Sequence, residues 1–311
     1  MTQFSDFIPQ RGERALIYGG TRSGKSSLAD WTVRKMLEQR PDMMPLLLDT
    51  KPRFRAEFQA YGLGNRWRKT AEPLYTSWEA GPVFPGSVVM PLDIDLDSSN
   101  PFKGFWRNPG ELCVLQSGNG YDRKRMLAIA RKFLNMNPKR RERLLWVNEG
   151  MDFYGRTSMS VDPTNDVILD CARAGGERGF GLLFEAHRPK GIPPMLNTLT
   201  SHVYLFHLRF QGDMHYLHDM GIPQEEEMPD GDYVFKHYKI QPGGTVSAPL
   251  TVKMNYPQSY LDSCLRVDMA KKDTDRERFE NLLLLALVGA FLTGFSMGAL
   301  LNLFRPKKTE V

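Results

Sequence analysis

One short segment near the start of the chain constrains the fold more than any other. Residues 19–26 read Gly-Gly-Thr-Arg-Ser-Gly-Lys-Ser and match the pattern G-x-x-x-x-G-K-[ST] in full. The apolar run Ala15–Tyr18 before it predicts a buried strand, and Ser27–Leu37 after it has helical spacing. A glycine-rich turn between a strand and a helix N-terminus aims backbone N–H groups at an anion. The segment therefore predicts a phosphate-binding loop in a nucleotide-binding protein.

The residue types in this loop predict separate tasks. Lys25 is expected to reach the β- and γ-phosphates of ATP, and the Ser26 hydroxyl is expected to take a place on Mg²⁺. The predicted cofactor is therefore Mg²⁺ together with ATP. The residues expected to surround the nucleotide are Gly19, Gly20, Thr21, Arg22, Ser23, Gly24, Lys25, Ser26 and Ser27.

Length and composition set broad limits on the kind of protein. A chain of 311 residues can hold one large α/β domain or two smaller ones. A net charge of +5 permits contact with nucleic acid or an anionic membrane but does not demand it. The three cysteines show no metal-binding spacing and are expected to stay reduced, and the N-terminus shows no signal peptide. No N-K-x-D motif is present, which argues against a GTP-specific switch protein.

Strands and helices alternate through the first two-thirds of the chain, which predicts an α/β fold with a mostly parallel sheet over residues 1–256. Residues 53–110 are less regular and predict an insertion with a small hairpin or helix of its own. Asp162 is expected to cap a helix that runs to about Ala174. The other predicted strands are 45–49, 112–116, 144–147, 180–186 and 203–208, the other helices are 121–137 and 214–220, and a hairpin is expected over 232–239 and 245–254.

The C-terminal part predicts a membrane anchor. Leu282–Phe304 is a run of 23 residues without a charge, which is long enough to cross a hydrocarbon core of about 30 Å. A buried core helix is disfavoured because no apolar/polar periodicity survives in this run. We expect a charged connector over 257–280, a transmembrane helix over 281–304 and a basic tail over 305–311. Small residues recur at every fourth position, a spacing that lets two helices approach closely: Ala290, Gly294 and Gly298.

A second acidic element is needed to hold Mg²⁺ and to orient the attacking water. The run Leu144–Glu149 has the usual form, a buried strand followed by two polar residues, but Asn148 stands where aspartate is expected. Asn148 can orient a Mg²⁺-bound water through its carbonyl oxygen without adding charge. Glu149 is the predicted general base or water-orienting residue, and Asp152 is its rival.

The stretch Cys171–Pro189 follows a pattern of its own. A helix ends in arginine and glycine, and an apolar strand then ends in Ala186-His187-Arg188-Pro189. This resembles the FtsK–HerA superfamily of ring-forming DNA-pumping ATPases, whose strand ends in Thr-Gln-Arg-Pro or a close variant. The likeness covers about residues 12–210 and implies a RecA-like core of the P-loop NTPase class. By this resemblance, Arg178 or Arg173 is the arginine finger that acts on a neighbouring subunit, and His187 stands in place of the sensor glutamine.

The resemblance also implies partners and a location. The compact ATPase domain is similar to the viral branch of the family, which implies a homo-oligomeric ring, such as a hexamer, that packages double-stranded DNA at a portal or membrane protein of a virion. The rival interpretations are an assembly ATPase of filamentous bacteriophages, which exports single-stranded DNA, and a membrane-tethered NTPase that acts on protein partners. In each case the ATPase domain is expected on the cytoplasmic side of a membrane, in a virion or the host inner membrane.

Two basic segments are candidates for contact with DNA. Residues 66–69 read Arg-Trp-Arg-Lys and mix basic with aromatic side chains, which suits a loop that tracks a nucleic-acid backbone. Residues 139–143 hold a denser basic cluster but come just before a buried strand. Either segment can equally be a solvated face.

Overall fold

The computed structural model describes the greater part of residues 7–254. The described ranges are 7–21, 23–50, 54–60, 67–73, 87–90, 92–107, 109–116, 120–136, 141–154, 166–219, 221–223, 229, 231 and 233–254. Within these ranges, no helix has the length and apolar character that a membrane crossing requires. The predicted connector, transmembrane helix and basic tail lie outside the described residues, as does Arg22.

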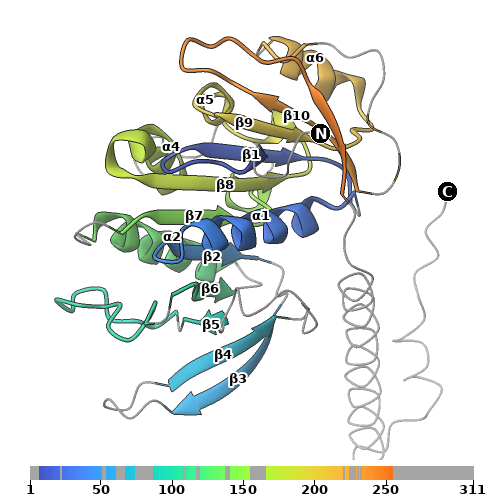
Figure 1. Cartoon of the computed structure of the whole chain (residues 1–311). Coiled ribbons are helices and arrows are strands. Elements are labelled where there is room, and N and C mark those ends of the chain that lie inside the picture. Colours follow the sequence, from blue (N-terminus) through green and yellow to red (C-terminus); the bar gives the residue numbers. More distant parts are fainter. Residues whose placement is uncertain are drawn as a thin grey trace, which may run out of the picture. The chain divides into compact units, whose positions relative to one another are not determined.

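All strands of the described part belong to one sheet, with the order β11-β10-β9-β1-β8-β7-β2-β6-β5-β4-β3 (Figure 1). The strands are β1 Arg14–Tyr18, β2 Met44–Asp49, β3 Phe54–Ala60, β4 Trp67–Pro73, β5 Ser87–Val89, β6 Leu112–Gln116, β7 Arg143–Val147, β8 Phe180–Ala186, β9 His202–Leu205, β10 Val234–Lys239 and β11 Leu250–Lys253. The helices are α1 Lys25–Gln39, α2 Gly120–Asn135, α3 Met151–Tyr154, α4 Val167–Arg178, the 3₁₀ helix η2 Pro189–Gly191, α5 Pro194–Thr198 and α6 Gln211–Asp219.

The middle of the sheet is parallel and both of its edges are antiparallel. Strands β9, β1, β8, β7, β2, β6 and β5 run parallel, whereas β10 and β11 at one edge and β4 and β3 at the other pair antiparallel. The prediction of an α/β fold with a mostly parallel sheet is confirmed. The predicted hairpins are present as β3–β4 within residues 53–110 and as β10–β11 at the end of the domain.

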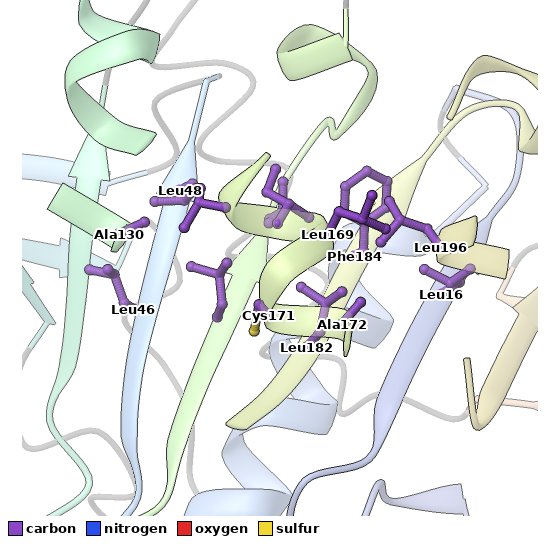
Figure 2. Close-up of a cluster of buried hydrophobic side chains, with 14 of the residues drawn as sticks. Leu16, Leu46, Leu48, Ala130, Leu169, Cys171, Ala172, Leu182, Phe184 and Leu196 are labelled. Atoms are coloured by element: carbon purple, nitrogen blue, oxygen red, sulfur yellow. The ribbon is translucent and has the colours of Figure 1, made fainter. Parts of the chain in front are cut away.

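Helices cover the two faces of the parallel strands. Right-handed crossovers place α1 on one face and α2, α4 and α5 on the other, and α4 accordingly contacts α2, α5 and β8 whereas α1 contacts β1 and β8. Figure 2 shows the core on the α4 side, where alternate strand residues meet the helix. The residues labelled there are Leu16, Leu46, Leu48, Ala130, Leu169, Cys171, Ala172, Leu182, Phe184 and Leu196.

The alternation of side chains along β8 decides which residues face α1. Leu182 and Phe184 point toward α4, so Leu183 and Glu185 point to the opposite face. Neighbouring β7 follows the same rule, because Leu145 and Val147 belong to the α4-side core and Trp146 does not. The face toward α1 therefore carries a buried carboxylate, Glu185, at the carboxyl end of β8.

The predicted boundaries of the helix before β8 are wrong at both ends. The helix α4 begins at Val167, because the Asp166 side chain accepts hydrogen bonds from the backbone N–H groups of Ile168 and Leu169. It continues past Gly175 to Arg178 and ends at Gly179, whose φ of 69° makes it the left-handed cap. Gly175 lies inside the helix and does not end it. Close packing explains why this residue is glycine, because a Cβ there would lie 2.5 Å from the Phe180 carbonyl oxygen.

Candidate nucleotide-binding site

The predicted phosphate loop joins the carboxyl end of β1 to the first turn of α1. Gly24 adopts a φ of 99°, a left-handed conformation that turns the chain into the helix at Lys25. Gly19 lies against the segment that follows β9, since a Cβ at Gly19 would come within 2.6 Å of the Phe206 Cβ atom. The loop is tied to this segment by a backbone hydrogen bond from Gly20 N–H to the His207 carbonyl. Glycine is therefore required at residue 24 by the backbone conformation and at residue 19 by close packing.

Lys25 is turned toward the centre of the loop. Its Nζ atom donates to the carbonyl oxygens of Gly19 and Gly20, both at 2.8 Å, and lies 3.2 Å from Nδ1 of His187. The residue is only 6% exposed. The first turn of α1 thus holds a buried cation at the carboxyl edge of the sheet, where ligands bind in open α/β folds.

His187 connects Lys25 to Glu149. The Nε2 atom of His187 lies 2.8 Å from Oε2 of Glu149. Because the Lys25 ammonium only donates, Nδ1 of His187 accepts, which leaves the proton on Nε2 to be donated to the Glu149 carboxylate. The three predicted catalytic residues Lys25, His187 and Glu149 therefore form one hydrogen-bonded chain, contributed by the first turn of α1 and by the residues that follow β8 and β7.

Glu149 occupies an unusual backbone conformation. Its φ is 51°, in the left-handed region that few non-glycine residues adopt. The following Gly150 donates its N–H to the Glu185 carbonyl, and a Cβ at Gly150 would lie 1.9 Å from the Phe184 ring. The turn after β7 is thus held tightly against β8, which aims the Glu149 side chain at His187.

The rival carboxylate, Asp152, is engaged elsewhere. Its Oδ2 atom accepts a hydrogen bond of 2.7 Å from the Thr50 hydroxyl and lies 4.0 Å from the Arg123 guanidinium. Asp152, in the first turn of α3, therefore links the residue after β2 to the first turn of α2. This geometry favours Glu149 over Asp152 as the residue that acts on a water molecule.

Asn148 faces a buried aspartate. Its side-chain amide donates to Oδ1 of Asp49 at 2.7 Å, and Asp49 is fully buried. The direction of this bond fixes the amide orientation, because a carboxylate only accepts. The Asn148 Oδ1 atom is buried and has no hydrogen-bond partner among the described residues. It is therefore an acceptor suited to a bound water molecule.

Glu185 is a candidate site residue that the sequence pattern did not predict. Glu185 is 1% exposed and its carboxylate accepts hydrogen bonds from the Ser26 hydroxyl at 2.7 Å and from the Trp146 indole N–H at 2.8 Å. The available signal was a single acidic residue inside the otherwise apolar strand Phe180–Ala186.

The two candidate arginine fingers lie away from this edge. Arg178 ends α4 at the amino end of β8, whereas His187 follows the carboxyl end of that strand. A strand of seven residues spans about 20 Å, so Arg178 and the phosphate loop of the same chain lie at opposite edges of the sheet. Arg173, which is exposed, lies one to two turns earlier on α4 and directs its Nε atom to the Met195 sulfur at 3.1 Å. Neither contacts Lys25, His187 or Glu149.

Both arginines border a cavity between α2 and α4. The cavity has a volume of about 290 Å³ and is lined by Arg131, Leu134, Asn135, Val167, Asp170, Cys171, Arg173, Ala174, Arg178 and Phe180. Three of these residues are arginines and one is an aspartate, so the lining carries net positive charge.

The two basic segments considered as candidate DNA contacts are only partly described. Arg143 is buried, and its guanidinium donates to the carbonyl oxygens of Phe133, Leu134 and Met136 at the end of α2. Arg143 therefore caps a helix and is unavailable to DNA, which corrects that part of the 139–143 prediction. Lys139 and Arg140 lie outside the described residues, as do Arg66 and the side chains of the rest of 66–69.

The residues at the carboxyl edge fit a nucleotide with a divalent cation. The loop supplies backbone N–H groups and the Lys25 cation for phosphates, and Ser26 and Glu185 supply the hydroxyl and carboxylate oxygens that Mg²⁺ prefers. The orphaned Asn148 oxygen adds a buried acceptor for a bound water. Together with the strand order, these features place the chain in the structural class of α/β phosphate-loop proteins.

Known proteins were compared with the chain at the levels of sequence and fold. No family model matches the chain, and no curated protein matches its sequence. Similar solved structures include the genome-packaging NTPase B204 of Sulfolobus turreted icosahedral virus 2 in complex with ATP-γS. The identity is 15%, with 79% of this chain and 98% of that chain covered and a TM-score of 0.49.

Two secretion ATPases have similar folds. The cytoplasmic domain of the type VII secretion ATPase EccC of Thermomonospora curvata is 12% identical over 81% of this chain and 27% of that chain, with a TM-score of 0.45. The EssC fragment with ATPases 2 and 3 from Geobacillus thermodenitrificans is 10% identical over 86% of this chain and 45% of that chain, with a TM-score of 0.45. The neighbours include genome-packaging ATPases, as the resemblance predicted. At such identities and scores they decide nothing about activity.

Proposed function

We propose that this protein is an ATP hydrolase whose nucleotide lies on the loop of residues 19–27. The observation that carries the proposal is the hydrogen-bonded chain Lys25–His187–Glu149 beside a complete phosphate-loop sequence. A buried cation, a carboxylate and an imidazole between them are the groups that phosphoryl transfer to water requires at one place. No other set of described residues combines them with an anion-binding loop.

In this proposal Glu149 accepts the proton of the attacking water. The hydrogen bond from His187 Nε2–H holds the Glu149 carboxylate in place, and Lys25 moves from the carbonyl oxygens of Gly19 and Gly20 to the β- and γ-phosphates when the nucleotide binds. His187 then loses its contact with Lys25, and its Nδ1 atom is left as an acceptor that faces the site. Bound Mg²⁺ would neutralise phosphate charge, with Ser26 and Glu185 as the residues that face it.

We further infer that the active form is a ring in which Arg178 serves the nucleotide of the next subunit. Since β8 separates Arg178 from the loop of its own chain by about 20 Å, a role of Arg178 in hydrolysis requires a second subunit. Arg173 is the alternative finger on the same helix. Such a finger neutralises charge that develops on the transferred phosphoryl group.

The motor function rests on the resemblance in Arg178–Pro189. We propose that hydrolysis drives translocation of double-stranded DNA, most specifically the packaging of a viral genome at a membrane to which residues 281–304 anchor the protein. A ring that presents one basic loop per subunit builds a positive channel, and its DNA binding weakens steeply with salt.

The test is ATP hydrolysis by the full-length protein in detergent, measured alone and with double-stranded or single-stranded DNA. We expect hydrolysis that double-stranded DNA stimulates and that added salt reverses. Preference for single strands instead supports the filamentous-assembly interpretation, and indifference to both DNA forms supports a protein partner. Absence of ATP binding and hydrolysis under all three conditions contradicts the proposed function itself.

A further inference from the structure

The carboxylate closest to the expected metal position is not on the strand where a phosphate-loop protein usually carries it. In such proteins an aspartate after the strand of Asn148 helps the loop serine or threonine to hold Mg²⁺. Here that position is Asn148, and its amide is committed to Asp49 at 2.7 Å. The charge that Mg²⁺ requires on the protein side therefore has to come from another residue.

Glu185 lies close to the phosphate loop and can supply this negative charge. It is the residue before the last of β8, and β8 is the immediate neighbour of β1, from which the phosphate loop starts. Its Oε2 atom accepts the Ser26 hydroxyl at 2.7 Å, and Ser26 is the loop residue expected on Mg²⁺. Asp49, another buried carboxylate at this edge, ends β2, which lies three strands and about 14 Å away from β1.

The surroundings of Glu185 hold its carboxylate in one orientation. Its side chain is 1% exposed, faces α1 by the alternation of β8, and receives a hydrogen bond from the Trp146 indole on its other oxygen. Metal ligands are commonly held in place by hydrogen bonds from neighbouring residues. Glu185 has such neighbours, because one of its oxygens accepts from the Ser26 hydroxyl and the other from the Trp146 indole.

We propose that Glu185 is the magnesium-side carboxylate of this site and takes over the charge that Asn148 lacks. The proposal rests on the proposed function, because it concerns the Mg²⁺ that accompanies ATP. Asn148 donates a hydrogen bond to the buried Asp49 through its amide and keeps its Oδ1 atom for a water molecule. In this proposal the metal-side charge comes from a carboxylate of β8, a residue to which the sequence pattern assigned no role.

The experiment measures nucleotide affinity rather than turnover. A fluorescent ATP analogue is titrated into the full-length protein with Mg²⁺ and again with EDTA, and the ratio of the two Kd values gives the metal contribution. Glu185→Gln should reduce this ratio by about 10- to 100-fold, the usual cost of losing a group that supports a metal site, and leave the Kd in EDTA nearly unchanged. Mn²⁺ binding to the nucleotide complex, followed by electron paramagnetic resonance, should weaken by the same factor.

Glu111→Gln serves as the control. It changes another buried glutamate, which accepts the Arg107 N–H away from this edge, and should leave the ratio intact. Asn148→Ala is a comparison within the site and should lower the ratio less than Glu185→Gln does. Retention of the ratio in Glu185→Gln would overturn the proposal.

The outcome remains decisive if Glu185→Gln does not fold, as circular dichroism would show. Glu185→Asp keeps the charge but withdraws it by one methylene group, so it should lower the ratio partially. An unchanged ratio in Glu185→Asp with a lost ratio in Asn148→Ala again overturns the proposal. If wild-type protein binds the analogue equally well with and without Mg²⁺, the metal role of Glu185 is refuted and the proposed function is not. If it binds the analogue in neither condition, the proposed function is refuted as well.

Discussion

Lys25 does two things at the residue scale, since it is both the expected phosphate cation and a donor to the loop itself. Its ammonium bridges the carbonyl oxygens of Gly19 and Gly20 and reaches His187. A cation held on backbone oxygens is already desolvated, so little reorganisation is needed for it to meet a phosphate. The same geometry means that its removal affects the loop as well as the chemistry.

Lys25→Ala should therefore abolish ATP hydrolysis and strongly weaken nucleotide binding. The reason is the loss of the only loop cation that the described residues place at the phosphate position. Phosphate release and titration with a fluorescent ATP analogue measure the two effects. Lys35→Ala, which removes a half-buried lysine paired with Glu38 on the same helix, is the control and should behave like wild type. Near-normal turnover in Lys25→Ala would refute the phosphate-loop interpretation.

Glu149→Gln should keep ATP binding and slow hydrolysis by about 100-fold or more, as expected when a positioned general base is lost. The amide retains the shape of the side chain and still accepts the His187 hydrogen bond, so binding is preserved. Single-turnover hydrolysis separates the chemical step from binding. Asp152→Asn is the matched comparison, since its carboxylate is held by Thr50 and Arg123. If Asp152→Asn is the more damaging change, the general base has been assigned to the wrong residue.

At the scale of elements, the sequence predicted the order of strands and helices but not every boundary. Runs such as Leu144–Val147 are apolar throughout because they are buried on both faces, and this signal is strong. The ends of α4 were mispredicted because Asp162 and Asp166 are both suitable caps, and because Gly175 looks like a stop signal until its packing against Phe180 is known. Tertiary contacts decide such cases and a single sequence does not contain them.

The candidate site shows the same division between local and distant information. Lys25, Glu149 and His187 were predictable because each follows a strand end in a recognisable pattern. Glu185 was not predictable, because its place beside the phosphate loop depends on the pairing of β8 with β1. These two strands are far apart in the chain. The engagement of Asn148 with Asp49 was hidden for the same reason.

Two neighbouring strands also carry a buried titratable chain at the edge opposite the phosphate loop. His202 of β9 donates from Nε2 to Glu13 at 2.8 Å, and its Nδ1 lies 2.9 Å from Nε2 of His237 on β10. Burial, with the nearby His202 and Lys239, lowers the pKa of His237 from 6.5 to about 3. Burial raises the pKa of Glu13, but hydrogen bonds from His202 and the Gln10 backbone outweigh it and lower the pKa from 4.5 to about 2.

Acidification should therefore destabilise the domain. The pKa values of both groups are lower in the folded chain, so their contributions are complete above pH 6.5 and pH 4.5 respectively and are lost as the pH falls toward 3 and 2. The free energy of unfolding, measured with denaturant, should decrease from pH 7 to pH 4. His237→Gln keeps a donor for His202 without titrating, and its stability should fall less over this interval. An equal decrease in this variant would show that His237 is not responsible.

At the scale of the whole molecule, the position of Arg178 at the far edge of the sheet makes a claim about assembly. Arg178→Ala should lower hydrolysis by about 10³-fold or more, the range known for arginine fingers. Mixed with Lys25→Ala subunits, it should regain partial activity, because some interfaces then join an intact loop to an intact arginine. Activity as a function of mixing ratio, with assembly confirmed by light scattering, measures the effect. The same series with Arg173→Ala decides between the two arginines, and no recovery at any ratio in either series argues for a purely structural role.

The remaining prediction concerns the anchor, which lies outside the described residues and depends on sequence alone. The uncharged run Leu282–Phe304 is long enough to span a bilayer, and basic residues flank both of its ends, so the positive-inside rule does not set its orientation. The need for ATP sets it instead, because a nucleotide-binding domain works on the cytoplasmic side.

Full-length protein should therefore resist extraction by alkaline carbonate and float with membranes. The double variant Leu285→Arg with Phe291→Arg should release it, since each charge near the bilayer centre costs about 2.5–3.5 kcal/mol. The ATPase activity of the released protein should persist, because no described residue of the site belongs to this segment. Full-length protein that stays in the soluble fraction without detergent would instead make 281–304 an oligomerisation helix, and the ring would then owe its assembly to that segment.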